Sequence, residues 1–339
     1  MFMLCLVWLS AQAQESPLWM RYNSISPDGS TIAFCYKGDI YTVPATGGRA
    51  FQVTTNPSYD THPVWSPDGK SIAFSSNREG SFDIYIVSRD GGVPRRLTTH
   101  SAHEYVETFK DNDHILYTAT IQWDASHGQF PTNLYPQVYE VSTQGKRPVM
   151  FSSHTMEEIA VNKNGETLLY TDKKGYEDPW RKHHQSSIAR DIWLYNIKDK
   201  KSFKKITSFA GEDRNAVWGP DGNTFFYLNE QDGNFNVYKS SVSRHSQPQQ
   251  ITKLKKNPVR FLSIADNGTL CFNYSGEIYT LQEGQSPKKV DIRIVSDKLE
   301  SDVITQYLGG GATDIAVRPD GKEIAFIVRG DVYVTSADY

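Results

Sequence analysis

The sequence Ser66-Pro67-Asp68-Gly69-Lys70-Ser71-Ile72-Ala73-Phe74-Ser75 joins a tight turn to a short strand, and related versions of it recur along the chain. Proline fixes φ at the first corner of such a turn, aspartate hydrogen-bonds its own backbone, and glycine adopts positive φ. The turns occupy residues 26–29, 66–69, 110–113, 162–165, 219–222, 265–268 and 318–321. Seven recurrences predict a protein built from repeated antiparallel sheet units.

A strand of the form Asp-Ile-Tyr follows the turn in each repeat and marks its period. Its aromatic residues are Tyr41, Tyr85, Tyr139, Trp193, Tyr238, Tyr279 and Tyr333. Successive members are 44, 54, 54, 45, 41 and 54 residues apart. Periods of about 40–45 residues, lengthened by insertions, are typical of four-stranded β-propeller blades. We therefore expect an all-β propeller in which these aromatic residues pack in the core.

The spacing between repeats indicates six blades rather than seven. Early repeats are separated by short connections, whereas 21 residues, including three successive glycines, lie between Ile292 and Asp314. Such a stretch is more typical of a linker than of a blade-to-blade loop. We predict a six-bladed β-propeller of four-stranded antiparallel blades over 19–292, a linker over 293–313, and the first strands of a second, truncated propeller over 314–339.

Each predicted blade is contiguous in sequence, which determines how the ring closes. Without a strand shared between the chain ends, the first and sixth blades are expected to meet mainly through side-chain packing. Cys35 and Cys271 align to the same face of equivalent strands, whereas neighbouring blades touch through opposite faces. We therefore expect two free, buried thiols and no disulfide between them.

The first 13 residues differ in character from the repeats. The apolar run 4–9 is followed by Ala11-Gln12-Ala13, a small-x-small pattern typical of secretory signal peptides, although no lysine or arginine precedes the run. We predict a signal peptide over 1–13, cleaved before Gln14, and hence an exported, periplasmic or cell-envelope protein. The alternative is a frayed apolar N-terminus on a cytoplasmic protein.

Composition and motifs exclude several functions. The net charge of −3 offers no basic surface for nucleic acid, and no apolar stretch is long enough to span a membrane. The sequence contains no nucleophile elbow, no phosphate-binding glycine loop and no Cys/His spacing that fits zinc. We therefore assign no catalytic residue, no metal and no cofactor to this chain. His100 and His103 are interpreted as exposed polar groups of a loop between blades two and three.

Six blades, a linker and a second propeller opening with 318–333, together with an insertion over 180–193, resemble the N-terminal part of tricorn-type serine proteases in their exported bacterial form. The resemblance implies a much longer parent chain that continues into a seven-bladed propeller, a PDZ domain and a serine peptidase domain. It implies that this propeller is noncatalytic, guides peptides or unfolded segments, excludes folded proteins and scaffolds the downstream domains. Homo-oligomerisation is left open.

The resemblance also raises a question about substrate anchoring. In archaeal members of that family, the loop between blades two and three carries an arginine pair to which binding of the substrate's C-terminal carboxylate is ascribed. Here the stretch 99–105 contains no arginine. The anchoring role therefore does not transfer to this chain.

Two insertions are the candidate binding elements. Residues 122–136 and 172–190 interrupt equivalent positions of neighbouring blades, so both are expected on one face of the ring, where long loops commonly bind ligands. The second insertion is basic and aromatic: Trp180, Arg181, Lys182, His183, His184 and Arg190. The hypothesis is that this loop contacts peptide carboxylates or docks against other domains. The alternative is a solvated surface loop.

Two other functions remain as alternatives. A periplasmic propeller resembling the TolB type would act in protein–protein interaction. A prolyl-oligopeptidase-like enzyme would place an α/β-hydrolase domain, rather than a second propeller, after this one. Both alternatives share the blade repeats, so the repeats alone do not separate them from a tricorn-like peptidase.

Overall fold

The computed structural model describes residues 17–121, 135–176, 185–200, 202–243, 247–295, 310–328 and 330–338. These residues form strands and turns, without a helix. Contacts divide the chain into two compact units, Met1–Ile294 and Val295–Tyr339. The predicted signal peptide and most of the predicted linker lie outside the described residues, so export stays a prediction.

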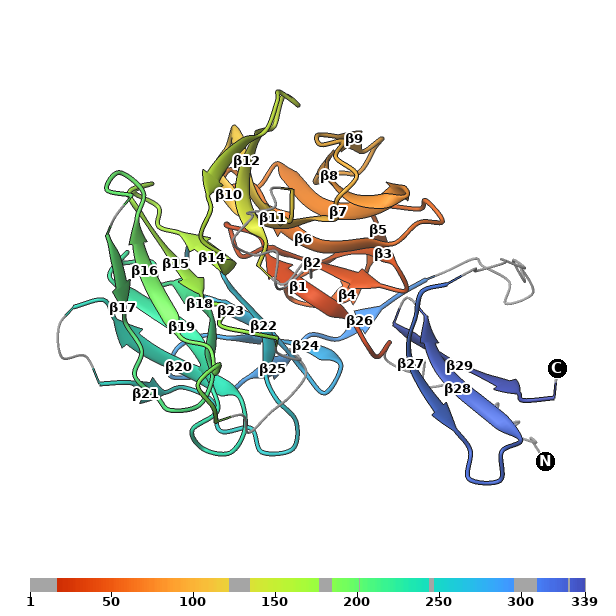
Figure 1. The fold of residues 1–339 in the computed structure, drawn as a ribbon. Coiled ribbons are helices and arrows are strands. Elements are labelled where there is room, and N and C mark those ends of the chain that lie inside the picture. Colours follow the sequence, from red (N-terminus) through yellow and green to blue (C-terminus); the bar gives the residue numbers. More distant parts are fainter. Residues whose placement is uncertain are drawn as a thin grey trace, which may run out of the picture. The chain divides into compact units, whose positions relative to one another are not determined.

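Six four-stranded antiparallel sheets build the first unit, and within each sheet the strands lie side by side in the order in which they occur along the chain (Figure 1). The first contains β1 (Arg21–Ile25), β2 (Thr31–Tyr36), β3 (Asp39–Pro44) and β5 (Phe51–Gln52). The second contains β6 (Asp60–Trp65), β7 (Ser71–Glu79), β8 (Ser81–Ser88) and β9 (Arg95–Arg96). The third contains β10 (Glu104–Asp111), β11 (His114–Ala119), β12 (Gln137–Ser142) and β13 (Val149–Ser152).

The remaining three sheets repeat this order. The fourth contains β14 (Glu157–Val161), β15 (Thr167–Thr171), β16 (Ile192–Asn196) and β17 (Phe203–Lys205). The fifth contains β18 (Asp213–Trp218), β19 (Thr224–Asn229), β20 (Asn236–Ser241) and β21 (Gln249–Gln250). The sixth contains β22 (Arg260–Ile264), β23 (Leu270–Tyr274), β24 (Glu277–Leu281) and β25 (Lys288–Lys289). The first strands of successive sheets contact one another, so they line the centre of a ring.

The recurring turn forms for the predicted reason. Asp68 Oδ1 accepts hydrogen bonds from Ser66 Oγ at 2.7 Å and from the backbone N of Lys70 at 3.1 Å. Gly69 has a φ of +68°, which a side chain would strain. The outer strand is fixed by a second repeated contact, in which a threonine hydroxyl accepts from the backbone N of the Asp-Ile-Tyr strand, as from Ile84 to Thr98 at 2.9 Å.

Six buried apolar clusters hold the sheets together, and each contains residues of two adjacent sheets. The cluster that closes the ring joins Phe34 and Tyr41 of the first sheet to Cys271 and Ile278 of the sixth. The third-strand aromatic rings pack in these clusters or beside them, with Tyr41 stacked on Phe34 at 5.8 Å between centroids. The predicted six-bladed β-propeller is confirmed, and the six sheets are its blades.

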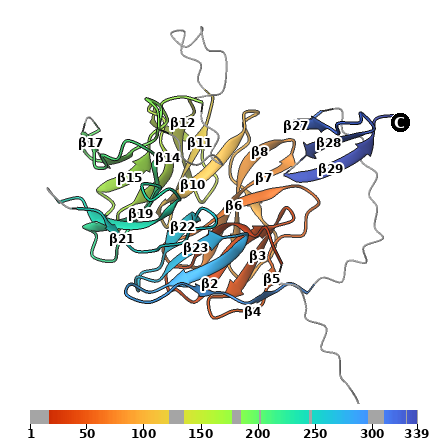
Figure 2. The ribbon, with the colours of Figure 1, turned by 90° about the horizontal axis from the view of Figure 1, so that it is seen from below.

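Backbone pairing also closes the ring, which the sequence prediction of a side-chain seam missed. The short strand β26 (Ile292–Arg293) pairs in parallel with β4 (Gly48–Arg49). A Cβ atom at Gly47 would lie 2.8 Å from the carbonyl oxygen of Asp291, so glycine permits this close approach. Figure 2 shows the sixth blade beside the first, where β22 and β23 contact β1.

Both cysteines behave as predicted. Cys35 and Cys271 are free and buried. Burial raises the pKa of each thiol to about 12, so neither thiolate forms readily near neutral pH. Cys271 Sγ accepts a hydrogen bond from Asn23 Nδ2 at 3.3 Å, which places it in the seam between blades six and one.

The second unit is a three-stranded antiparallel sheet. It contains β27 (Ala312–Val317), β28 (Glu323–Val328) and β29 (Asp331–Ser336), in that order. Phe326 and Tyr333 stack at 5.7 Å between centroids, as the equivalent aromatic pairs do in the blades. This sheet therefore has the architecture of the first three strands of a blade.

Candidate functional site

One position of every inner strand bulges toward the axis of the ring. The antiparallel register shifts there, and five of the six residues have a φ between +51° and +55°, which is uncommon outside glycine. We call this set the axial belt: Tyr22, His62, Glu107, Glu158, Asn215 and Phe261. Backbone strain repeated in this way is typical of positions that serve a function.

The belt is polar on blades three to five. Glu107 Oε2 accepts a hydrogen bond from the backbone N of Glu158 at 2.8 Å, and Glu158 Oε2 accepts from the backbone N of Asn215 at 2.7 Å. Asn215 Oδ1 then accepts from the backbone N of Leu262 at 2.7 Å. Each of these side chains therefore binds the inner strand of the next blade and sets the spacing around the axis.

The belt is aromatic on blades six, one and two. The rings of Tyr22 and His62 lie 3.8 Å apart between centroids, and those of Tyr22 and Phe261 lie 4.9 Å apart. Burial lowers the pKa of His62 to about 4, so its imidazole is uncharged at neutral pH. The lining of the axis is therefore two-sided, with rings facing carboxylates and amides.

Alternating charges support the polar side. Arg214 lies 2.6 Å from a carboxylate oxygen of Glu158 and 3.8 Å from one of Glu212. Burial opposes ionisation of Glu158, but Arg214 outweighs it and holds the pKa of that carboxyl below its usual value. Burial, with help from neighbouring Glu157, raises the pKa of Glu107 to about 8.

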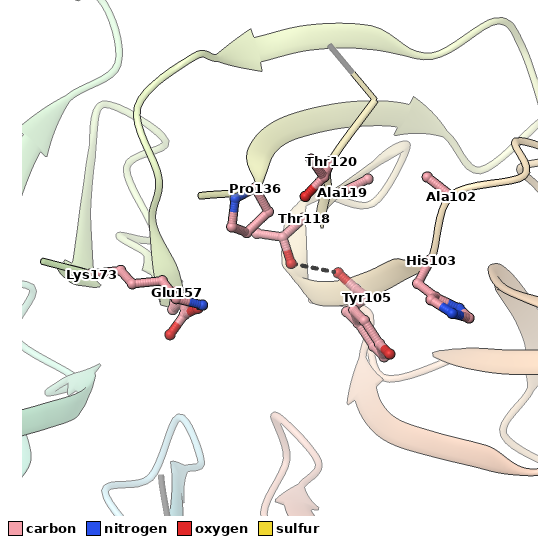
Figure 3. A pocket seen from close by; sticks show the side chains of 9 residues that line it. All are labelled: Ala102, His103, Tyr105, Thr118, Ala119, Thr120, Pro136, Glu157 and Lys173. Atoms are coloured by element: carbon pink, nitrogen blue, oxygen red, sulfur yellow. Dashed lines mark hydrogen bonds and ion pairs between the residues drawn. The ribbon is translucent and has the colours of Figure 1, made fainter. Parts of the chain in front are cut away.

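A cavity of about 330 Å³ opens beside the belt, where the inner strands begin (Figure 3). It is lined by Ala102, His103, Tyr105, Thr118, Ala119, Thr120, Pro136, Glu157 and Lys173. Both predicted insertions begin at this face, because their first or last residues line the cavity or flank it. Tyr135 Oη donates a hydrogen bond to the backbone O of Lys174 at 3.2 Å, so the bases of the two insertions lie side by side as predicted.

The predicted binding loop is only partly within the described residues. Trp180, Arg181, Lys182, His183 and His184 lie outside them, so their role stays a prediction. Arg190 is described, and its side chain is 4% exposed. It lies 2.5 Å from Glu157 and 3.6 Å from Glu212, so it acts behind the cavity wall rather than on the surface.

A buried acidic pair lies between blades two and three, next to the cavity. Asp83 and Glu104 are both buried; Arg96 lies 2.9 Å from Asp83, and the hydroxyls of Thr98 and Tyr117 lie close to the carboxyl of Glu104. Burial, to which the charge of Asp83 adds, raises the pKa of Glu104 to about 7. The folded protein therefore keeps this carboxyl mostly protonated only below about pH 7.

Replacing Glu104 with glutamine should make the protein more stable at high pH. The folded-state pKa of Glu104 lies above its ordinary value. The contribution of protonated Glu104 to the free energy of unfolding is therefore complete below about pH 4.5 and is lost as pH rises through about 7. We expect Glu104→Gln to match the wild type near pH 5 and to exceed it by about 2 kcal/mol near pH 8. Urea unfolding at both pH values measures this difference. The exposed Glu283→Gln is the control, and equal pH dependence in both variants would contradict the prediction.

The described ranges contain no group of three or more His, Cys, Asp or Glu side chains placed to hold a metal ion. No helix long and apolar enough to cross a membrane occurs in the part of the chain that the structure describes.

Six contiguous blades around an axis lined by bulged side chains define the class of six-bladed β-propellers. Residues 17–287 match the family described as the tricorn protease N-terminal beta propeller domain. The chain belongs to this family, and the predicted resemblance to tricorn-type proteases is confirmed.

Curated relatives and a solved structure agree with this assignment. Tricorn protease homolog 1 of Streptomyces coelicolor is 23% identical over 94% of this chain and 29% of its own length. The tricorn protease homolog of Saccharolobus solfataricus is 22% identical over 93% of this chain and 28% of its own length. The crystal structure of the tricorn protease superposes with a TM-score of 0.69 at 19% identity, over 94% of this chain and 30% of that one. The chain thus spans less than a third of the length of these relatives.

Propellers of other kinds share the fold. The crystal structure of TolB from Acinetobacter baumannii has a TM-score of 0.51 at 15% identity, over 80% of this chain and 66% of that one. At this identity the likeness concerns the blade architecture alone.

Sequence reasoning missed the axial belt and the cavity wall. The belt could have been recognised by aligning the inner strands. The alignment places a large polar or aromatic residue at a position where a core strand would carry a small apolar one. Tyr105 and Glu157 have a weaker signal, because each lies at the start of an inner strand and only the folded ring brings them to one cavity.

Proposed function

We propose that this chain is the noncatalytic, peptide-handling propeller of a tricorn-like serine peptidase. Membership of the family supports the peptidase context. The observation that carries the proposal is the cavity of about 330 Å³ beside the axial belt, lined by aromatic, polar and small side chains. In this proposal an extended peptide reaches that lining and a folded domain does not.

The two-sided belt suits a polypeptide of mixed sequence. Tyr22 and Phe261 on its aromatic side suit the apolar side chains of a peptide. Glu158 and Asn215 on its polar side suit polar groups of a peptide, and Glu158 already accepts a hydrogen bond from the backbone N of Asn215. Peptides carry both kinds of group along one chain. A lining of this kind therefore favours passage of many sequences over tight binding of one.

In this proposal the propeller works with other domains of a longer protein. PDZ and serine peptidase domains would follow it, and the second unit of this chain would open a further propeller. The whole protein would act after export, in the periplasm or cell envelope, in agreement with the signal peptide predicted over 1–13.

Peptide binding by the full chain tests the proposal. We expect fluorescently labelled, unstructured peptides to raise their anisotropy on addition of the chain, and a compact folded protein of similar charge to leave its anisotropy unchanged. Unlabelled peptide should compete. Binding of the folded protein in preference to the peptides would instead support a protein-interaction propeller, and no peptide binding would overturn the proposal.

A further inference from the structure

The aromatic side of the cavity continues as a row of rings toward the axis. Phe82 lies 5.3 Å from Tyr105 and 5.7 Å from His103 between ring centroids. Tyr105 lies 6.4 Å from His62, the belt residue that packs against Tyr22. We call this row the aromatic track: Phe82, His103, Tyr105, His62, Tyr22 and Phe261. Successive rings of the track lie 3.8–6.4 Å apart between centroids, from the cavity to the axial belt.

The opposite wall of the cavity is charged but internally neutralised. Figure 3 shows Lys173 and Glu157 across the cavity from Tyr105 and His103. Lys173 Nζ lies 2.7 Å from one carboxylate oxygen of Glu157, and Arg190 lies 2.5 Å from the other. The cation that lines the cavity is therefore already paired, and a ligand carboxylate would have to compete with Glu157 for it.

A backbone contact holds His103 at the cavity wall. The backbone N of Phe82 donates a hydrogen bond to His103 Nδ1 at 3.2 Å, and the ring of His103 lies 6.3 Å from that of Tyr105 between centroids. Small side chains, including Thr120 and Pro136, complete the lining. The cavity of about 330 Å³ lies at the lower end of the range for ligand pockets, about 300–1,000 Å³, which suits one large side chain.

We infer that this cavity is a subsite for an aromatic side chain of an unfolded peptide, which packs against Tyr105 and His103 at the start of the aromatic track. The inference rests on the proposed peptide handling and adds a preference to it. Aromatic rings favour offset or edge-to-face contact with other rings, and Tyr105 leaves 38% of its surface available for such contact. A terminal carboxylate has no unpaired cation among the described residues that line this cavity.

Two unstructured peptides of equal length and charge test the subsite. They differ in one central residue, phenylalanine in one and alanine in the other, and binding to the full chain is measured by fluorescence anisotropy. We expect the phenylalanine peptide to bind the wild type about tenfold more tightly, and Tyr105→Ala to reduce this preference to less than about twofold. Tyr105→Phe should keep it. Phe203→Ala is the matched control, because Phe203 is 40% exposed but lies on an outer strand.

The outcomes separate this inference from the proposed function. Equal binding of both peptides to the wild type would overturn the aromatic subsite and leave peptide handling intact. No binding of either peptide would overturn both. Should Tyr105→Ala fail to fold, as judged by thermal unfolding, Thr120→Trp provides a second test, because Thr120 lines the cavity just after the end of β11 and the larger side chain would fill it. Retained preference in Thr120→Trp would also count against the subsite.

Discussion

Replacing Phe34 with alanine is expected to lower the free energy of unfolding by about 3–5 kcal/mol. Phe34 is fully buried and belongs to the apolar cluster that joins blade one to blade six. Alanine would leave a cavity in the seam where the ring closes, and rigid β-sheets on both sides limit its collapse. Urea unfolding followed by tryptophan fluorescence measures the loss.

Phe51→Ala is the control for this experiment. Phe51 also lies in blade one, but 55% of it is exposed, so its truncation should change stability by less than about 1 kcal/mol. If Phe34→Ala were no more destabilising than Phe51→Ala, the cluster between blades one and six would not hold the ring together.

Replacing Arg214 with methionine is expected to cost about 2–4 kcal/mol. Methionine keeps much of the length of the side chain but removes the cation nearest to Glu158, and it leaves buried Glu212 with only the more distant Arg190, at 3.6 Å, among the described residues. The double variant Arg214→Met, Glu158→Gln should recover part of the loss, since it removes the carboxylate that has lost its nearest cation. Thermal and urea unfolding of the single and double variants measure both effects.

An exposed ion pair is the control that shows how much burial adds to the effect of Arg214→Met on stability. Lys163 lies 2.8 Å from Asp266, and both side chains are more than half exposed. Lys163→Met should therefore change stability by less than about 1 kcal/mol. A similar small effect for Arg214→Met would show that the charges around the axis are solvated and do not organise the belt.

The repeats were sufficient to predict the blade architecture, because each local signal has a local cause. Asp68 and Gly69 form their turn from adjacent residues, and Thr98 contacts a strand of its own blade. The number of blades required one long-range inference, from the 21 residues before Asp314. The six apolar clusters, each shared by two adjacent blades, agree with that count.

The site depended on contacts that sequence spacing does not encode. Arg190 belongs to a basic insertion, yet the fold turns it inward onto Glu157, 33 residues earlier in the chain. Tyr105 and Lys173 come from neighbouring blades and meet at one cavity only because the ring sets their separation. The pairing of β26 with β4 involves two residues on each strand, too few to produce a recognisable pattern.

The segment that pairs with β4 also has a mechanical consequence. Gly48 and Ala50 donate backbone hydrogen bonds to the carbonyl oxygens of Asp291 and Arg293, and the second unit begins at Val295. The pairing of β26 with β4, which closes the ring, is therefore almost directly followed in the chain by the start of the second unit. A pulling force applied on the C-terminal side would act on the β26–β4 pair before any blade. It would therefore first break the backbone hydrogen bonds between β26 and β4 that help to join blade six to blade one.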